Sequence, residues 1–287
     1  MTKYLRELKP TSIHDINAMV ALYRPGPIES IPEYIRRKHN PSLIQYLDPR
    51  MKDILSQSYG VITYQDDVLL TAINLAGYSW AEADKLREAI GKKIPAEMQA
   101  QKEKLIKGLV SNGMSEPKSE TLWKLIEPFA AYGFNKSHGA SYGRVAYQTA
   151  YMKANFPAEY MTAVLTADSG DMEKVAEIIT ECQRMNIPVL PPDVNESLAQ
   201  FTLIKGAPGD GDKIRFGLES VKNVGTNIVE AIIQARGSEG KFSSLTDFAE
   251  KVKHKDFNKK SFESLVKCGA LDGLGERNQL IGNLELI

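Results

Sequence analysis

Apolar residues recur at three- and four-residue intervals along most of the first 185 residues, which is the spacing of one buried face of an α-helix. This periodicity predicts helices at 15–22, 65–75, 79–90, 99–112, 119–129, 157–165 and 171–185. One short β-favouring run, 61–64, interrupts the pattern. We therefore expect residues 1–187 to form one multi-helix domain with hardly any sheet.

The pattern changes at the proline-rich run 188–193, which marks a domain boundary. Two strand-like segments, 201–204 and 213–216, follow a short distance later, and the Gly-rich stretch between them predicts a β-hairpin. The turn 221–225 then has the apolar and glycine residues of a helix-hairpin-helix element, and Asn258 can cap a second helical unit. The predicted fold is thus mainly α, with a linker, a short β-hairpin and a small tandem helix-hairpin-helix domain over residues 188–287.

The segment 132–142 combines a glycine-containing turn with aromatic and hydrogen-bonding side chains, and it leads into another predicted helix. Ser137 can cap that helix. The orphan N–H groups of the first turn, flanked by Lys136 and His138, form a natural phosphate site. Three rings of the segment can face a base or a sugar: Tyr132, Phe134 and Tyr142. The commoner arrangement for such residues is a capped helix whose Lys and His are merely solvated.

Two other groups of basic residues are candidate anion-binding surfaces. Arg87, Lys92 and Lys93 lie at the end of a predicted helix and in the turn after it, where flexible cations can converge on one anion. The cluster 36–39 also follows a predicted helix and can touch a DNA backbone. Cations are common at the C-terminal ends of helices, however, so a solvated helix end is the alternative for both groups.

No acidic pair has the geometry of a catalytic metal site. Asp66 and Asp67 are neighbours on a predicted helix, so their side chains point about 100° apart, and a helix-dipole role suits them better. Asp210 and Asp212 lie in the Gly-rich hairpin connection, which is typical of a turn. We predict no metal ligand and no catalytic residue in the chain.

Composition narrows the picture only slightly. The 287 residues include 36 Lys and Arg and 36 Asp and Glu, so any binding to nucleic acid must depend on local clusters of charge. No apolar run approaches the roughly 20 residues that span a bilayer. Cys182 and Cys268 lack metal-site spacing, which suits free thiols in a reducing cytoplasm. We therefore expect a cytoplasmic protein with no membrane partner.

Several blocks of sequence identify a family. They include Ala-Leu-Tyr-Arg-Pro-Gly-Pro at 21–27, Tyr-Gly-Val-Ile-Thr-Tyr-Gln at 59–65, Phe-Ala-Ala-Tyr-Gly-Phe-Asn-Lys-Ser-His at 129–138, and Leu-Pro-Pro-Asp-Val-Asn at 190–195. In this order, and over nearly the whole chain, they resemble the α subunits of bacterial DNA polymerase III, the family C replicative polymerases. Gly139 and the pair Gly143-Arg144 depart from the family, in which Ala-Leu is common at the latter two positions.

The resemblance implies that residues 1–187 are the helical fingers domain and that 188–287 include the start of the tandem helix-hairpin-helix region. The nucleotide-binding residues that it implies are Arg87, Lys92, Lys93, Tyr132, Asn135, Lys136, Ser137, His138 and Tyr142. The DNA-binding residues that it implies are Arg144, Lys222, Asn223 and Gly225. Its implied partners are primer-template DNA, deoxynucleoside triphosphates and other replicase subunits.

Template-directed nucleotidyl transfer by this family implies Mg²⁺ held by carboxylates of a palm domain outside the fragment. The fragment should then bind no cofactor and be inactive alone. A non-enzymatic DNA-binding module, in which the hairpin region carries the function, is the main alternative. A third is an enzyme that uses His138 as a general base, although no acid or nucleophile is near it in sequence.

Overall fold

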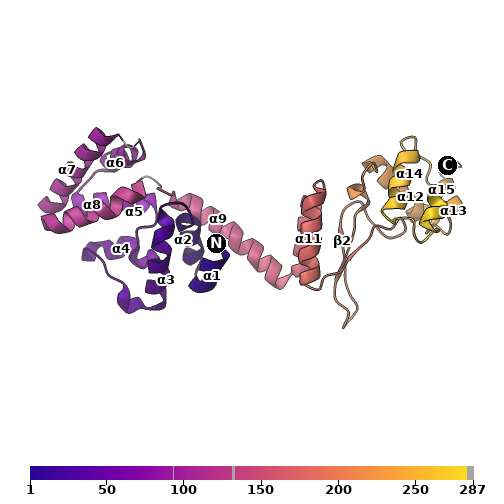
Figure 1. Cartoon of the computed structure of the whole chain (residues 1–287), viewed down its shortest axis with the longest axis horizontal. Helices are drawn as coiled ribbons and strands as arrows, with labels where there is room; N and C mark the ends of the chain where they lie inside the picture. The colour runs from indigo at the N-terminus through magenta and orange to yellow at the C-terminus, as the bar shows by residue number, and fades with distance from the viewer. Residues whose placement is uncertain (93, 131–132, 283–287) are drawn as a thin grey trace. The chain divides into compact units, whose positions relative to one another are not determined.

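The computed structural model describes residues 1–92, 94–130 and 133–282, and it falls into two compact units, Met1–Gln148 and Thr149–Ile287 (Figure 1). Helices dominate both units, and the sheet found among the described residues has three short strands. The predicted mainly α fold is therefore confirmed.

The first unit is built from helices joined by short turns. Its α-helices are α1 (Thr2–Leu8), α2 (Ile13–Leu22), α3 (Ile31–His39), α4 (Lys52–Leu55), α5 (Gln65–Ala76), α6 (Trp80–Lys92), α7 (Pro95–Ser111) and α8 (Glu116–Ala130), followed by the first part of α9 (Lys136–Asn155). Four 3-10 turns lie between them, η1 (Pro27–Ser30), η2 (Pro41–Leu43), η3 (Pro49–Met51) and η4 (Ser56–Ser58). The predicted helices at 15–22, 65–75 and 79–90 agree closely with α2, α5 and α6.

Two hydrophobic clusters hold this unit together. A smaller one, which includes Leu8, Met19 and Tyr34, joins α1, α2 and α3. A larger one joins α4 to α8. Within it α7 lies very close to the end of α5, since a Cβ on Gly108 would be 2.4 Å from the carbonyl oxygen of Ala76. Only glycine fits at that crossing. This explains why Gly108 lies inside α7, although glycine ordinarily weakens a helix.

Side-chain hydrogen bonds define the starts of α5 and α6. The predicted capping box at Ser79 is confirmed, because Ser79 N–H donates to Glu82 at 2.8 Å and Glu82 N–H donates back to Ser79 Oγ at 3.3 Å. The predicted β run at 61–64 is wrong, because these residues form no strand. Asp67 instead accepts the N–H groups of Thr63 and Tyr64, so the run becomes the entry to α5.

The second unit combines helices with the small sheet. After the end of α9 come α10 (Pro157–Ala167), α11 (Met172–Arg184), β1 (Val189–Leu190), β2 (Thr202–Ile204), β3 (Lys213–Arg215), the 3-10 turn η5 (Leu218–Ser220), α12 (Thr226–Glu239), α13 (Leu245–Lys251), α14 (Lys259–Lys267) and α15 (Arg277–Gly282). The strand order is β1-β3-β2, with β1 parallel and β2 antiparallel to β3. The antiparallel hairpin was predicted, whereas β1 lies in the proline-rich run and was not.

The hairpin connection and the domain boundary are the remaining features of this unit. Asp212 accepts Gly206 N–H at 3.0 Å, so the Asp210–Asp212 pair belongs to the hairpin connection, as predicted. A hydrophobic cluster joins Met161 and Val175 of α10 and α11 to Ile214 of β3, across the proline-rich run. The compact units accordingly divide at 148/149, inside α9. The boundary at 187/188 remains a prediction about family domains.

Candidate nucleotide and DNA interface

The beginning of α9 is fixed by the protein's own oxygen atoms. Asn135, not Ser137, is the capping side chain, since its Oδ1 accepts His138 N–H at 3.1 Å, while Ser137 lies inside the helix. Lys136 N–H donates to Asp66 Oδ2 at 3.1 Å, and Gly139 N–H donates to the Asn135 carbonyl. The predicted phosphate site on free N–H groups is therefore largely filled, and the Ser137 cap is corrected to Asn135.

A reciprocal contact ties this turn to α5. Gln65 N–H, at the first residue of α5, donates to the Phe134 carbonyl at 3.0 Å. The Gln65 side chain lies over Gly133 so closely that a Cβ there would be about 2.3 Å from Gln65 Cγ. The beginnings of α5 and α9 are thus held side by side, 70 residues apart in sequence. No spacing rule could have paired Asp66 with Lys136.

Among the described residues the Lys136 ammonium makes no salt bridge, although its charge acts on the buried Asp67 carboxyl. Its Nζ is 3.4 Å from Gln57 Oε1 and 5.7 Å from the centre of the buried Tyr64 ring, within the range of a cation–π contact. The side chain is half-buried. A cation that is held in place without a salt bridge keeps its charge for an anionic ligand.

Rings follow one another along the first turns of α9. The Arg24 guanidinium lies 4.4 Å from the centre of Phe134, the His138 ring is 5.3 Å from Phe134, and Tyr142 is 4.5 Å from His138. His138 is exposed and Tyr142 is 59% exposed, so this ring row reaches solvent. Exposed stacked rings are a usual platform for nucleic-acid bases. Tyr132, predicted to face a base or sugar, lies outside the described residues.

The same packing explains the two departures from the family pattern. Gly139 and Gly143 form the buried side of the early α9. A Cβ on Gly139 would be 3.0 Å from the Phe134 ring, and one on Gly143 would be 1.9 Å from Asn17 Oδ1. Asn17 is buried, and its Oδ1 has no hydrogen-bond partner among the described residues. Glycine at both positions lets α9 pack this closely.

Of the two described residues of the cluster Arg87, Lys92 and Lys93, the structure brings Arg87 to this turn. It lines a small pocket with Tyr64, Gln65 and Gly133, and its guanidinium is 2.7 Å from Asp84. The pocket volume is about 20 Å³, close to that of one water, so a nucleotide would have to bind on the open surface. Lys92 does not line the pocket, and its Nζ is 3.8 Å from Glu88 Oε2. Lys93 lies outside the described residues.

The carboxyl group of Asp67 lies beneath this surface. It is 2% exposed, and burial raises its pKa to about 6, although the N–H groups of Thr63 and Tyr64 and the Lys136 charge oppose the rise. The expected helix-dipole position of Asp66 and Asp67 is correct, since both lie in the first turn of α5. Each also makes a specific contact that the dipole argument alone did not predict.

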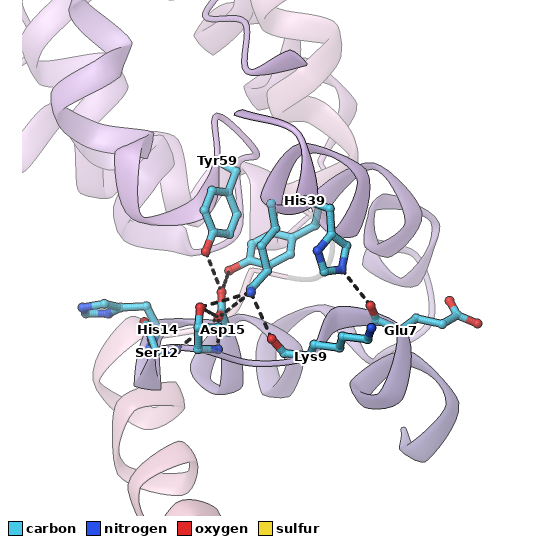
Figure 2. A network of polar contacts seen from close by, with 10 residues as sticks. Glu7, Lys9, Ser12, His14, Asp15, His39 and Tyr59 are labelled. Carbon is cyan, nitrogen blue, oxygen red and sulfur yellow. Dashed lines mark hydrogen bonds and ion pairs between the residues drawn. The ribbon is translucent and has the colours of Figure 1, made fainter. Parts of the chain in front are cut away.

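The basic cluster 36–39 serves the fold. Arg36 and Arg37 both bond to Glu33, and Lys38 Nζ is 3.5 Å from the buried Asp15 and donates to the Lys9 carbonyl at 3.0 Å. Figure 2 shows Asp15 at the centre of this network, with Tyr59 donating to it at 2.9 Å and His39 at the Glu7 carbonyl. Burial raises the pKa of Tyr59 to about 12, so its hydroxyl stays protonated and can donate. We therefore assign this cluster to contacts within the first unit, with Arg36 and His39 on its surface.

The second unit offers a separate candidate surface at the turn 221–225. Asn223 has a φ of 64°, the left-handed conformation of a tight turn, and its side chain donates to Ser264 at 3.0 Å. Helix α12 begins after Gly225 without a side-chain cap. Lys222 and Lys260 line a groove of about 1270 Å³ next to this turn. Lys222, Asn223 and Gly225 all line this groove, and their contact with DNA stays a prediction.

Arg144 is exposed on α9. Among the described residues, the exposed His138 ring contacts the rings of Phe134 and Tyr142, which supply no acid partner for a general base. Within the described ranges, no group of three His, Cys, Asp or Glu side chains could hold a metal ion, and no helix is long and apolar enough to cross a bilayer. Cys182 and Cys268 are free thiols.

Comparison with known proteins identifies the family of the chain. Residues 1–113 match the family described as the bacterial DNA polymerase III alpha subunit finger domain, and 186–280 match a helix-hairpin-helix motif family. The chain is 44% identical to the DNA polymerase III subunit alpha of Thermus aquaticus and 42% identical to that of Deinococcus radiodurans, over 99% and 98% of its length. It spans only 23% and 21% of those relatives.

A third relative, the DNA polymerase III subunit alpha of Saccharopolyspora erythraea, is 44% identical over 96% of the chain, which again spans 23% of that protein. The finger-domain match lies within the first compact unit and the helix-hairpin-helix match within the second, and the relatives align over nearly the whole chain. The chain therefore belongs to the bacterial DNA polymerase III α subunits, of which it carries a finger-domain segment followed by a helix-hairpin-helix segment.

Proposed function

We propose that this chain serves template-directed DNA synthesis by contacting the incoming nucleotide and the primer-template DNA. The observation that carries the proposal is the exposed His138–Tyr142 ring row beside Lys136, a half-buried cation that makes no salt bridge among the described residues. A nucleotide has an anionic end and a ring, and this surface offers a cation and rings within a few residues. Arg87 and Asn135 lie at the same turn and complete the proposed nucleotide surface.

Because the N–H groups of Lys136 and His138 are already bonded, side chains are left to carry most of the contact to phosphate. Lys136 would neutralise charge that grows on the leaving pyrophosphate, which is electrostatic stabilisation of a transition state. His138 can donate a hydrogen bond to the same group. The aromatic row would support the base or the sugar.

The described residues do not fit the Mg²⁺ that such a reaction uses. Asp66 accepts Lys136 N–H, Asp67 is buried against two N–H groups, and Asp212 is paired with Lys205. We place the metal, the catalysis and the other replicase subunits with the rest of the polymerase. A cytoplasmic location belongs to the same proposal.

A second candidate function is DNA binding by the helix-hairpin-helix segment itself. It is favoured by the uncapped start of α12 and by the open groove that Lys222 and Lys260 line. Such a turn can offer backbone N–H groups to a phosphate. This candidate differs from the first in the residues that DNA binding should require.

We expect the chain to bind a fluorescent primer-template duplex in a salt-sensitive manner, measured by anisotropy. Four phosphate contacts would lower the affinity by about 10²-fold between roughly 50 and 200 mM salt, because released counterions oppose binding. Replacing Arg87, Lys92 and Arg144 together by Ala should weaken binding and reduce the salt slope. Primer extension in the same mixture should give no product.

A charge-matched control replaces Lys3, Lys107 and Lys124, which are exposed elsewhere on the first unit, and should bind like the unaltered chain. If only a Lys222→Ala, Lys260→Ala variant loses affinity, the second candidate function is correct. Binding that ignores salt would exclude both, and extension by the pure chain would show that it carries its own catalytic site.

A further inference from the structure

The carboxylate of Asp66 occupies the place where a helix start usually attracts an anion. Its Oδ2 accepts Lys136 N–H at 3.1 Å, at the first residue of α9. It therefore competes for that position with any phosphate from solution. Asp66 is half-buried and comes from α5, so the contact joins two helices rather than capping one.

The hydrogen bond from Lys136 to Asp66 is one of two between the starts of α5 and α9, and the two bonds run in opposite directions. Gln65 N–H donates to the Phe134 carbonyl, and Lys136 N–H donates to the side chain of the next residue, Asp66. Two such bonds fix both the distance and the register between the two helix starts. The Gln65 side chain closes the remaining space over Gly133.

The ammonium of the same lysine depends on this register. Gln57 and Tyr64, which hold Lys136 Nζ, both precede α5, whereas Lys136 belongs to α9. A shift of α9 along α5 would move Nζ away from both. His138 and Tyr142 follow on the next turns, so they would shift with it.

We infer that Asp66 is a positioning residue: it holds the start of α9 on α5 so that the Lys136 ammonium faces the phosphates of the incoming nucleotide. This inference rests on the proposed nucleotide contact of Lys136. The hydrogen-bond acceptor on Asp66 carries the effect. The negative charge of Asp66, in contrast, opposes phosphate binding. Because the acceptor oxygen and the charge have opposite effects, substitutions can separate them.

Two variants make that separation in the full chain. Asp66→Asn keeps an acceptor oxygen for Lys136 N–H and removes the charge, whereas Asp66→Ala removes both. Both lose the same favourable charge at the start of α5, so that contribution cancels between them. Lys136→Ala serves as the variant that should abolish the nucleotide contact itself.

The first readout needs no nucleotide. Amide hydrogen exchange of the Lys136 N–H should be slow in the unaltered chain and in Asp66→Asn, and about tenfold faster or more in Asp66→Ala, as expected for the loss of one charged hydrogen bond. Equal exchange rates in all three proteins would overturn the tether.

The second readout is titration with dATP and Mg²⁺. Asp66→Asn should bind dATP at least as tightly as the unaltered chain, while Asp66→Ala and Lys136→Ala should each bind about tenfold more weakly. Asp66→Ala binding that equals the unaltered chain would overturn the inference, as would an equal loss in Asp66→Asn. No dATP binding by the unaltered chain would instead overturn the proposed nucleotide contact, and with it the need for a positioning residue.

Discussion

In a polymerase α subunit that contains this segment, replacing Lys136 by Ala should slow nucleotide incorporation by about 10²–10³, or about 2–4 kcal/mol of activation free energy. The expected loss is that of a preorganised charge aimed at the leaving pyrophosphate. Alanine keeps the backbone N–H that bonds to Asp66, so α9 should keep its place. Single-turnover incorporation over a range of nucleotide concentrations measures the effect.

The control for this substitution is Lys107→Ala, which removes the same charge from an exposed position on α7 and should leave incorporation unchanged. Affinity for primer-template DNA should change little in Lys136→Ala, because the contact is made to the nucleotide. An unchanged incorporation rate with normal nucleotide affinity would reduce Lys136 to a structural residue packed on Tyr64.

The second large effect concerns stability and pH. Asp67→Asn should stabilise the first unit at pH 7–8 by about 2–3 kcal/mol, because each unit of pKa shift corresponds to about 1.4 kcal/mol. Both N–H bonds go to one oxygen, Oδ2, which an Asn carbonyl can replace. The uncharged amide avoids the cost of burying a charge.

The sign follows from the raised pKa of Asp67, which is about 6 in the fold against an ordinary value of 3.8. Protonated Asp67 suits the fold, so its contribution is favourable below pH 3.8 and is lost as pH rises through 6. The advantage of Asn should therefore be largest above pH 7 and shrink towards pH 4.

Urea unfolding followed by tryptophan fluorescence measures this difference selectively, because Trp80 and Trp123 are the two tryptophans of the chain and both lie in the first unit. Asp53→Asn, an exposed carboxylate on α4, controls for the change in net charge. An advantage of Asn that does not vary with pH, or a less stable Asn variant, would contradict the assignment of a raised pKa to Asp67.

Much of the fold could be predicted because its signals are local. Apolar periodicity found the helices, the Ser79–Glu82 spacing found a capping box, and the Asn258 cap of α14 was confirmed by its bonds to Lys260 and Ser261. The β run at 61–64 failed because β propensity says nothing about a partner strand, and Asp67 took its N–H groups instead.

The site could be predicted only in part. The residue types of the segment predicted a cation and aromatic rings at the start of α9. They could not predict the cap, because Ser137 and Asn135 are both good capping residues and only the backbone path decides between them. The pairing of Asp66 with Lys136 and of Arg24 with Phe134 joins segments far apart in sequence. The same is true of Asp15 and Lys38, which turned a candidate DNA-binding cluster into part of the fold.

The most direct test of the two proposed surfaces is a hydrogen-exchange footprint of the chain with and without primer-template DNA at low salt. We predict slower exchange at 133–144 and at 221–225 when DNA is bound, and no change at 36–39, where the basic side chains are bonded internally. Protection confined to 36–39, or no protection at either proposed surface under conditions in which DNA is bound, would contradict this assignment.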